Sequence, residues 1–116
     1  MYKEVEKYNW SEWRVFPDPR KGEILIAPYG FGIYQLRDVQ SGEFILFGRG
    51  NNCAYRMSSL LPKPFGQGTR NNESKRLYLL ENLSKIEYRT ISLLNLDEMI
   101  KVETEVKELR IHKFNT

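Results

Sequence analysis

Three side chains in this 116-residue sequence have the chemistry of a phosphate-hydrolysing site: Tyr34, Arg56 and Glu103. A guanidinium such as that of Arg56 can hold two phosphate oxygens at once and keeps its charge at neutral pH. A tyrosine can act as a base where nearby positive charge stabilises the phenolate. A lone carboxylate can hold a divalent cation. Taken singly, Arg56 is most simply a solvated helical residue and Tyr34 a packing residue at a strand end.

Glu103 stands out because it interrupts the apolar face of an expected helix over residues 97–110. At about 100° per residue, the apolar side chains of this region fall on one arc: Leu96, Met99, Val102, Val106 and Leu109. Glu103 lies between the first two of these, so its carboxylate must be paired, protonated or bound to a cation. On this pattern alone, an ion pair with an arginine at the edge of the sheet is the favoured interpretation.

The spacing of these residues follows one template. Gly32-Ile33-Tyr34 is followed, after residues 35–45, by Leu46-Phe47-Gly48, and Arg56 is the eighth residue after Gly48. Glu103 and Asn115 then stand twelve residues apart near the end of the chain. Over residues 31–115 this arrangement resembles the GIY-YIG nuclease family.

The resemblance implies a metal-dependent endonuclease that hydrolyses phosphodiester bonds, with DNA favoured over RNA. Tyr34 would orient or deprotonate the attacking water, and Arg56 would stabilise charge on the phosphoryl oxygens. Glu103 would hold one Mg²⁺, with Mn²⁺ as an alternative. Three further motif residues would be structural and lie near the site: Gly32, Gly48 and Asn115, the last of these securing the C-terminal segment.

Two departures from the family pattern keep a second interpretation open. Leu46 takes the place of the second motif tyrosine and cannot form a hydrogen bond, so Tyr34 has no evident phenolic substitute. The histidine that often follows the family's arginine is also missing from residues 57–61. The alternative is a non-catalytic module that binds nucleic acid or a protein partner and keeps the nuclease fold.

The stretch from Lys63 to Arg76 is rich in basic and amide side chains. One interpretation is a loop and helix start that binds the nucleic-acid backbone, and the other is an ordinary solvated face. The candidate nucleic-acid-binding residues are Lys63, Arg70, Asn71, Asn72 and Lys75.

The hydrophobic pattern predicts an α+β fold with a small, mainly antiparallel, three-stranded sheet flanked by helices. Strands are expected over 32–37, 43–47 and 86–93, with 43–47 at the centre of the sheet because its density of β-forming residues is typical of a strand buried on both faces. Helices are expected over 53–61, 73–83 and 97–110, capped by Asn51 or Asn52 and by Asn71 or Asn72 for the first two. A short helix within 2–13 and a brief strand or extended segment at 23–27 are also expected.

Composition limits the alternatives without choosing between them. The net charge of +3 permits a nucleic-acid partner but does not require one. One cysteine and one histidine cannot form an intrachain disulfide or a Cys/His zinc site. With no signal-like or membrane-spanning apolar run, we expect a soluble, cytoplasmic protein. Residues 1–30, with Trp10 and Trp13 as anchors, are expected to pack on a nuclease-like domain formed by residues 31–116.

Overall fold

The structure, a computed structural model, describes residues 3–68 and 72–115. Within them, four antiparallel strands form one sheet in the order β1-β4-β2-β3. The strands are β1 (Arg14–Val15), β2 (Gly32–Asp38), β3 (Phe44–Gly50) and β4 (Ile86–Ser92). The α+β class and the antiparallel pairing are therefore as predicted.

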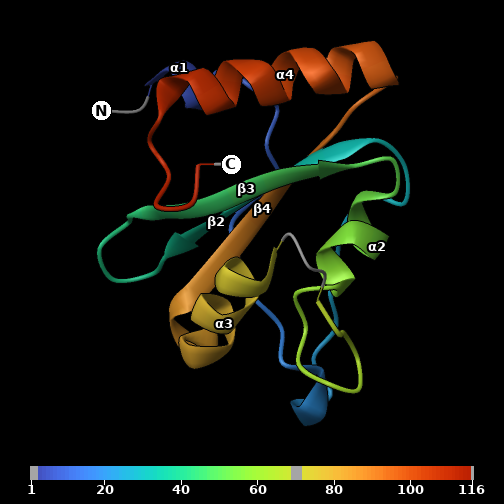
Figure 1. The fold of residues 1–116 in the computed structure, drawn as a ribbon. Coiled ribbons are helices and arrows are strands. Elements are labelled where there is room, and N and C mark those ends of the chain that lie inside the picture. The colour runs from blue at the N-terminus through green and yellow to red at the C-terminus, as the bar shows by residue number, and fades with distance from the viewer. Residues whose placement is uncertain (1–2, 69–71, 116) are drawn as a thin grey trace.

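The helices lie in layers on the two faces of this sheet (Figure 1). They are α1 (Lys3–Glu6), α2 (Cys53–Ser58), α3 (Glu73–Glu81) and α4 (Leu96–Leu109), with 3-10 turns at η1 (Pro19–Lys21) and η3 (Leu83–Lys85). In Figure 1, α4 runs along one face, whereas α2 and α3 lie on the other. No helix among the described residues has the length and apolar character needed to cross a membrane.

Each face of the sheet carries its own hydrophobic core. Under α4, the core includes Ile33, Phe47, Met99 and Val106. The core on the other face is formed by side chains from β2, β3, β4, α2 and α3: Tyr34, Leu36, Leu46, Met57, Leu79 and Tyr88 are among them. Leu46, which occupies the position of the second tyrosine in the GIY-YIG motif, is fully buried in this core.

The prediction of three strands was wrong because β1 is a fourth. This strand has only two residues, too few to show a periodicity, and it is held by pairing with β4. The predicted central position of residues 43–47 was also wrong, since β3 is at the end of the sheet order. Its apolar character has another cause: helical layers cover both faces, and the C-terminal segment lies along it, where the Phe114 amide donates to the Ile45 carbonyl at 2.8 Å.

Several element ends differ from the expected ones. The helix predicted over 53–61 ends at Ser58, and the one predicted over 73–83 ends at Glu81.

Asn52 caps α2 as predicted, accepting from the Tyr55 amide at 3.0 Å. Asn72 stands at the N-cap position of α3, but its amide donates to Ser59 Oγ at 2.9 Å instead of capping the helix. Asn71 lies outside the described residues. Residues 23–27 form no strand, and within the described residues 3–13 the predicted helix is limited to α1.

The N-terminal segment is held to the sheet by aromatic rings and arginines. Trp13 stacks on Phe44, with ring centroids 6.3 Å apart. The Arg89 guanidinium lies 4.3 Å from the Trp10 ring centroid and 4.4 Å from that of Trp13, and Arg37 lies 3.9 Å from Trp13. These contacts place both tryptophans in the packing of the segment on the core.

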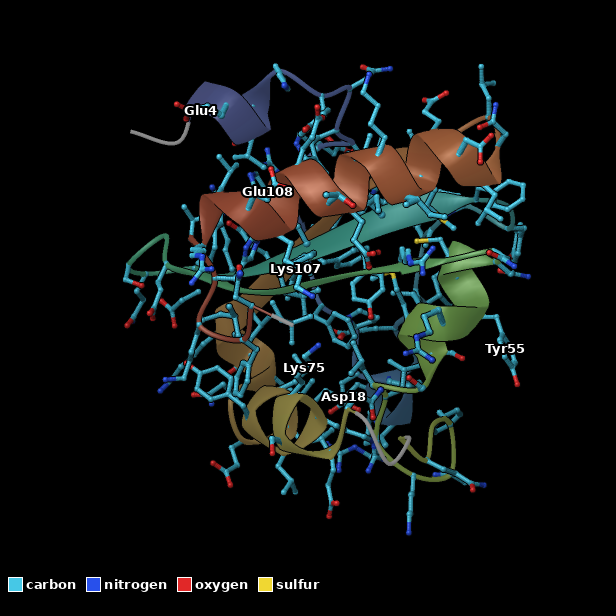
Figure 2. All side chains as sticks on the ribbon, turned by 45° about the horizontal axis from the view of Figure 1, so that its top comes forward. Glu4, Asp18, Tyr55, Lys75, Lys107 and Glu108 are labelled. Carbon is cyan, nitrogen blue, oxygen red and sulfur yellow. The ribbon has the colours of Figure 1, made fainter. Side chains whose placement is uncertain are left out.

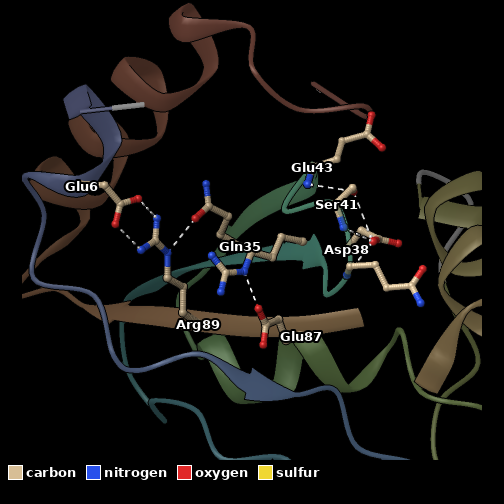
Figure 3. A network of polar contacts seen from close by, with 9 residues as sticks. Glu6, Gln35, Asp38, Ser41, Glu43, Glu87 and Arg89 are labelled. Atoms are coloured by element: carbon tan, nitrogen blue, oxygen red, sulfur yellow. Dashed lines mark hydrogen bonds and ion pairs between the residues drawn. The ribbon is translucent and has the colours of Figure 1, made fainter. Parts of the chain in front are cut away.

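A buried polar network continues from Arg89 into the sheet (Figure 3). Arg89 donates to both carboxylate oxygens of Glu6, at 2.7 and 2.6 Å, and to Gln35 Oε1 at 2.8 Å. Because the Oε1 atom of Gln35 accepts from Arg89, the NH₂ group of Gln35 faces His112 Nε2, 2.9 Å away. That nitrogen must accept, so the proton of neutral His112 sits on Nδ1. Burial lowers the pKa of His112 to about 4, an effect that Asn115 partly offsets.

Candidate active site

A cavity of about 990 Å³ lies beside β3 and is lined by residues of β2, β3, α2, α3 and α4. Tyr34 of β2, Arg56 of α2 and Glu103 of α4 all line it. The fold therefore brings together three candidate residues that are far apart in the sequence.

Gly48 makes room for the Tyr34 side chain. The two residues face each other in the β2–β3 pairing. A Cβ atom on Gly48 would lie 2.3 Å from Tyr34 Oη and 2.5 Å from Cζ, closer than van der Waals contact allows. The Tyr34 ring thus covers the backbone of β3 at a position where the opposite residue has no side chain.

Two other glycines set the position of α2 and its arginine. A Cβ on Gly32 would lie 2.9 Å from Cys53 Cβ, at the first residue of α2, and 2.8 Å from the Ile91 carbonyl oxygen. A Cβ on Gly50 would lie 2.8 Å from Arg56 Cβ. The absence of side chains at these positions lets α2 approach the sheet closely enough for Arg56 to reach the cavity.

Burial dominates the electrostatics of Tyr34. The side chain is 6% exposed, and burial raises its pKa to about 12. Arg56 acts in the opposite direction, through its charge and a hydrogen bond to the hydroxyl, whereas the charge of Glu103 raises the pKa further. In this structure the Tyr34 hydroxyl is therefore protonated at neutral pH.

Glu103 is paired with an arginine at the edge of the sheet, as the sequence pattern alone favoured. Arg49 Nε of β3 lies 3.1 Å from Glu103 Oε1, and the two side chains are 39% and 29% exposed. Arg49 was not among the predicted site residues, although it also lines the cavity. Arg49 lies two residues after Phe47 on β3, so both side chains face α4, but this spacing does not identify Arg49 as the partner of Glu103.

The predicted nucleic-acid-binding stretch reaches the cavity only in part. Asn72 and Lys75 line it, whereas Lys63 is exposed and is not among the lining residues. Burial and the charge of Arg56 lower the pKa of Lys75, while Glu103 raises it. Figure 2 shows Lys75 above α3, with Lys107 between it and α4. Arg70 and Asn71 lie outside the described residues.

Tyr55 is a second cavity residue that the sequence reasoning did not single out. It precedes Arg56 on α2, is 79% exposed, and points outward in Figure 2. A second tyrosine therefore lines the same cavity as Tyr34, whereas the expectation that Tyr34 has no phenolic substitute stays a prediction. The position of Tyr55 directly before the motif arginine is the only signal in the sequence.

Asn115 lies near the site without lining the main cavity. Its side-chain amide donates to the Lys107 carbonyl at 2.8 Å, which ties the C-terminal segment to α4. Asn115, Lys107 and Glu103 line a smaller cavity of about 560 Å³. Glu103 thus borders both cavities.

The donor set of the main cavity suits a cation that keeps most of its water. Among the described residues that line it, Glu103 is the only carboxylate, and no group of three or more His, Cys, Asp or Glu is found in the described part of the chain. Mg²⁺ typically binds through one or two carboxylates together with waters and substrate phosphates. Glu103 fits that mode, but its Oε1 is already paired with Arg49.

Comparison of the chain with protein-family models, curated proteins and solved structures found no match. The resemblance to the GIY-YIG nucleases therefore rests on the motif residues and their spacing.

Proposed function

We propose that the chain is a metal-dependent endonuclease of the GIY-YIG type that hydrolyses phosphodiester bonds in DNA. The observation that supports it most is the single cavity that gathers Tyr34, Arg56 and Glu103 from three different elements. Arg49 and Lys75 line the same cavity, so positive side chains outnumber its one described carboxylate, as a site for a phosphate requires.

Each residue has a distinct role in this proposal. Arg56 binds the phosphoryl oxygens and stabilises the charge that builds on them as water attacks. Tyr34 accepts a hydrogen bond from that water and orients it, and its phenolate form takes the proton. A divalent cation held by Glu103 would supply positive charge beside the phosphoryl and leaving oxygens. Lys75 adds a further positive charge to the wall formed by α3.

The proposal is tested by cleavage of supercoiled, linear and single-stranded DNA with Mg²⁺ or Mn²⁺, with EDTA as the blank. Arg56→Ala and Glu103→Gln should each abolish cleavage while leaving the fold intact. Glu87→Gln is the matched control for Glu103→Gln, because Glu87 is also paired with an arginine, Arg37, but does not line the cavity. Parental cleavage by both Arg56→Ala and Glu103→Gln would show that the site is wrong.

A second function is favoured by the Arg49–Glu103 pair and by Leu46. With Glu103 already paired and Leu46 in the core, the cavity could bind a phosphate of a nucleic acid without cutting it. Such a non-catalytic module would still bind DNA in a mobility-shift assay, and Arg56→Ala would weaken that binding. It would not cleave DNA with either Mg²⁺ or Mn²⁺.

A further inference from the structure

The Arg49–Glu103 pair differs from the other arginine pairs of the sheet by its place at the cavity. Arg14 pairs with Glu12, Arg37 with Glu87 and Arg89 with Glu6, and none of these six residues is among those lining the cavity. Both members of the Arg49–Glu103 pair line it and are partly exposed. An ion pair with that exposure contributes little to stability, so it can open at small cost.

Each member of this pair has a second use within the same cavity. A guanidinium forms its strongest contacts with carboxylates and phosphates, in the same two-pronged geometry. Arg49 can therefore leave Glu103 when a phosphate enters beside Arg56. Glu103, once released, offers the only carboxylate among the described lining residues. Conversely, a cation that binds Glu103 without a phosphate meets the Arg49 guanidinium at Oε1 and its like charge beside Oε2.

We propose that Arg49 exchanges partners: it holds Glu103 when no ligand is bound, and binds a phosphate oxygen when a divalent cation takes Glu103. This inference rests on the proposed role of Glu103 as the cation ligand. Its consequence is a thermodynamic coupling between the two ligands. Binding of the phosphate frees Glu103 for the cation, and by reciprocity the cation frees Arg49 for the phosphate. The cavity then favours cation and phosphate together over either one alone.

The test measures Mn²⁺ binding to the intact protein by electron paramagnetic resonance of the free ion, with and without dimethyl phosphate, a phosphodiester that resists cleavage. Three proteins are compared: the parent, Arg49→Gln, and Arg37→Gln as the matched control. Arg49→Gln should bind Mn²⁺ alone at least about 3-fold more tightly than the parent, because the competing ion pair is gone. Dimethyl phosphate should tighten Mn²⁺ binding by about 5-fold or more in the parent and in Arg37→Gln, but not in Arg49→Gln. Adding Glu103→Gln to each of the three proteins should abolish Mn²⁺ binding at this site.

Equal Mn²⁺ affinities of the parent and Arg49→Gln would overturn the exchange, and so would a coupling that persists in Arg49→Gln or the absence of Glu103-dependent binding. If Arg49→Gln does not fold, Arg49→Lys replaces it: the charge is kept and the planar fork is lost, so the coupling should weaken while Mn²⁺ affinity stays near that of the parent. Cleavage by the parent is scored separately. Exchange without cleavage would refute the nuclease proposal alone, and cleavage without exchange would refute this inference alone.

Discussion

Replacing Gly48 by alanine sets two effects of opposite sign against each other. In a strand interior, alanine is favoured over glycine by about 0.5–1 kcal/mol because glycine loses more backbone freedom on folding. The added Cβ, however, would lie 2.3 Å from Tyr34 Oη and 2.5 Å from Cζ. Tyr34 is buried and cannot simply swing aside, so overpacking should cost about 1–3 kcal/mol. The steric term is the larger, and we expect Gly48→Ala to lower the free energy of unfolding by about 0.5–2 kcal/mol.

Urea unfolding at neutral pH measures this change, and Gly30→Ala is its matched control. A Cβ on Gly30 meets nothing within 4 Å, so that variant should be neutral or slightly stabilised. The clash is assigned to Tyr34 by repeating Gly48→Ala in a Tyr34→Leu background, where the cost should largely disappear. If Tyr34 is catalytic, a displacement of its ring by about 1 Å should also slow cleavage on the order of 100-fold. A stabilised Gly48→Ala, or an equal cost in both backgrounds, would refute the packing of Tyr34 over Gly48.

Three further predictions follow from the charges of single residues. Because the pKa of Tyr34 is raised to about 12, cleavage should keep rising with pH across the neutral range, by about tenfold per unit, as the phenolate fraction grows. Tyr34→Phe should remove that rise and cut the rate by about 10²–10⁴-fold, with DNA affinity unchanged in a mobility-shift titration. Lys75→Ala should lower the slope of log affinity for duplex DNA against log salt concentration by about one unit. An unchanged slope would show that Lys75 does not contact a DNA phosphate. His112 has a pKa of about 4 in the folded protein and 6.5 in the unfolded chain. Between these values the unfolded chain binds one more proton than the folded protein, so the free energy of unfolding decreases as the pH is lowered below 6.5. The loss should reach about 3 kcal/mol below pH 4, and a His112→Asn variant, compared by urea unfolding at several pH values, should lack it.

The elements of the sheet were predictable where the signal is local. Residues 86–93 alternate between apolar and polar side chains, and the structure has β4 over Ile86–Ser92. The two residues of β1 carry no such signal, because pairing with β4 alone makes them a strand. The central position expected for 43–47 failed for a related reason. An apolar run reports burial on both faces, and helical layers supply that burial to β3 at the edge of the sheet as fully as neighbouring strands would.

The candidate site was predictable as far as spacing reaches. Motif spacing and the helical arc named Tyr34, Arg56 and Glu103, which the fold places around one cavity. Arg49 and Tyr55 were missed, since neither breaks a pattern in the sequence. The partner of Glu103 depends on how α4 lies over β3, a tertiary relation that no local periodicity encodes.

The raised pKa of Tyr34 links the two functions considered for this cavity. Burial is its largest cause, and the positive charge of Arg56 does not overcome it. The charge of Glu103 also raises the pKa, so neutralising that carboxylate should move Tyr34 toward the phenolate. Arg49 already provides a positive partner to Glu103, yet the pKa of Tyr34 is about 12. This ion pair alone therefore does not lower the pKa of Tyr34 enough for it to act as a base at neutral pH. We therefore expect the same residues to bind a phosphate without cutting it until additional positive charge stands at Glu103, and to hydrolyse it when that charge is present.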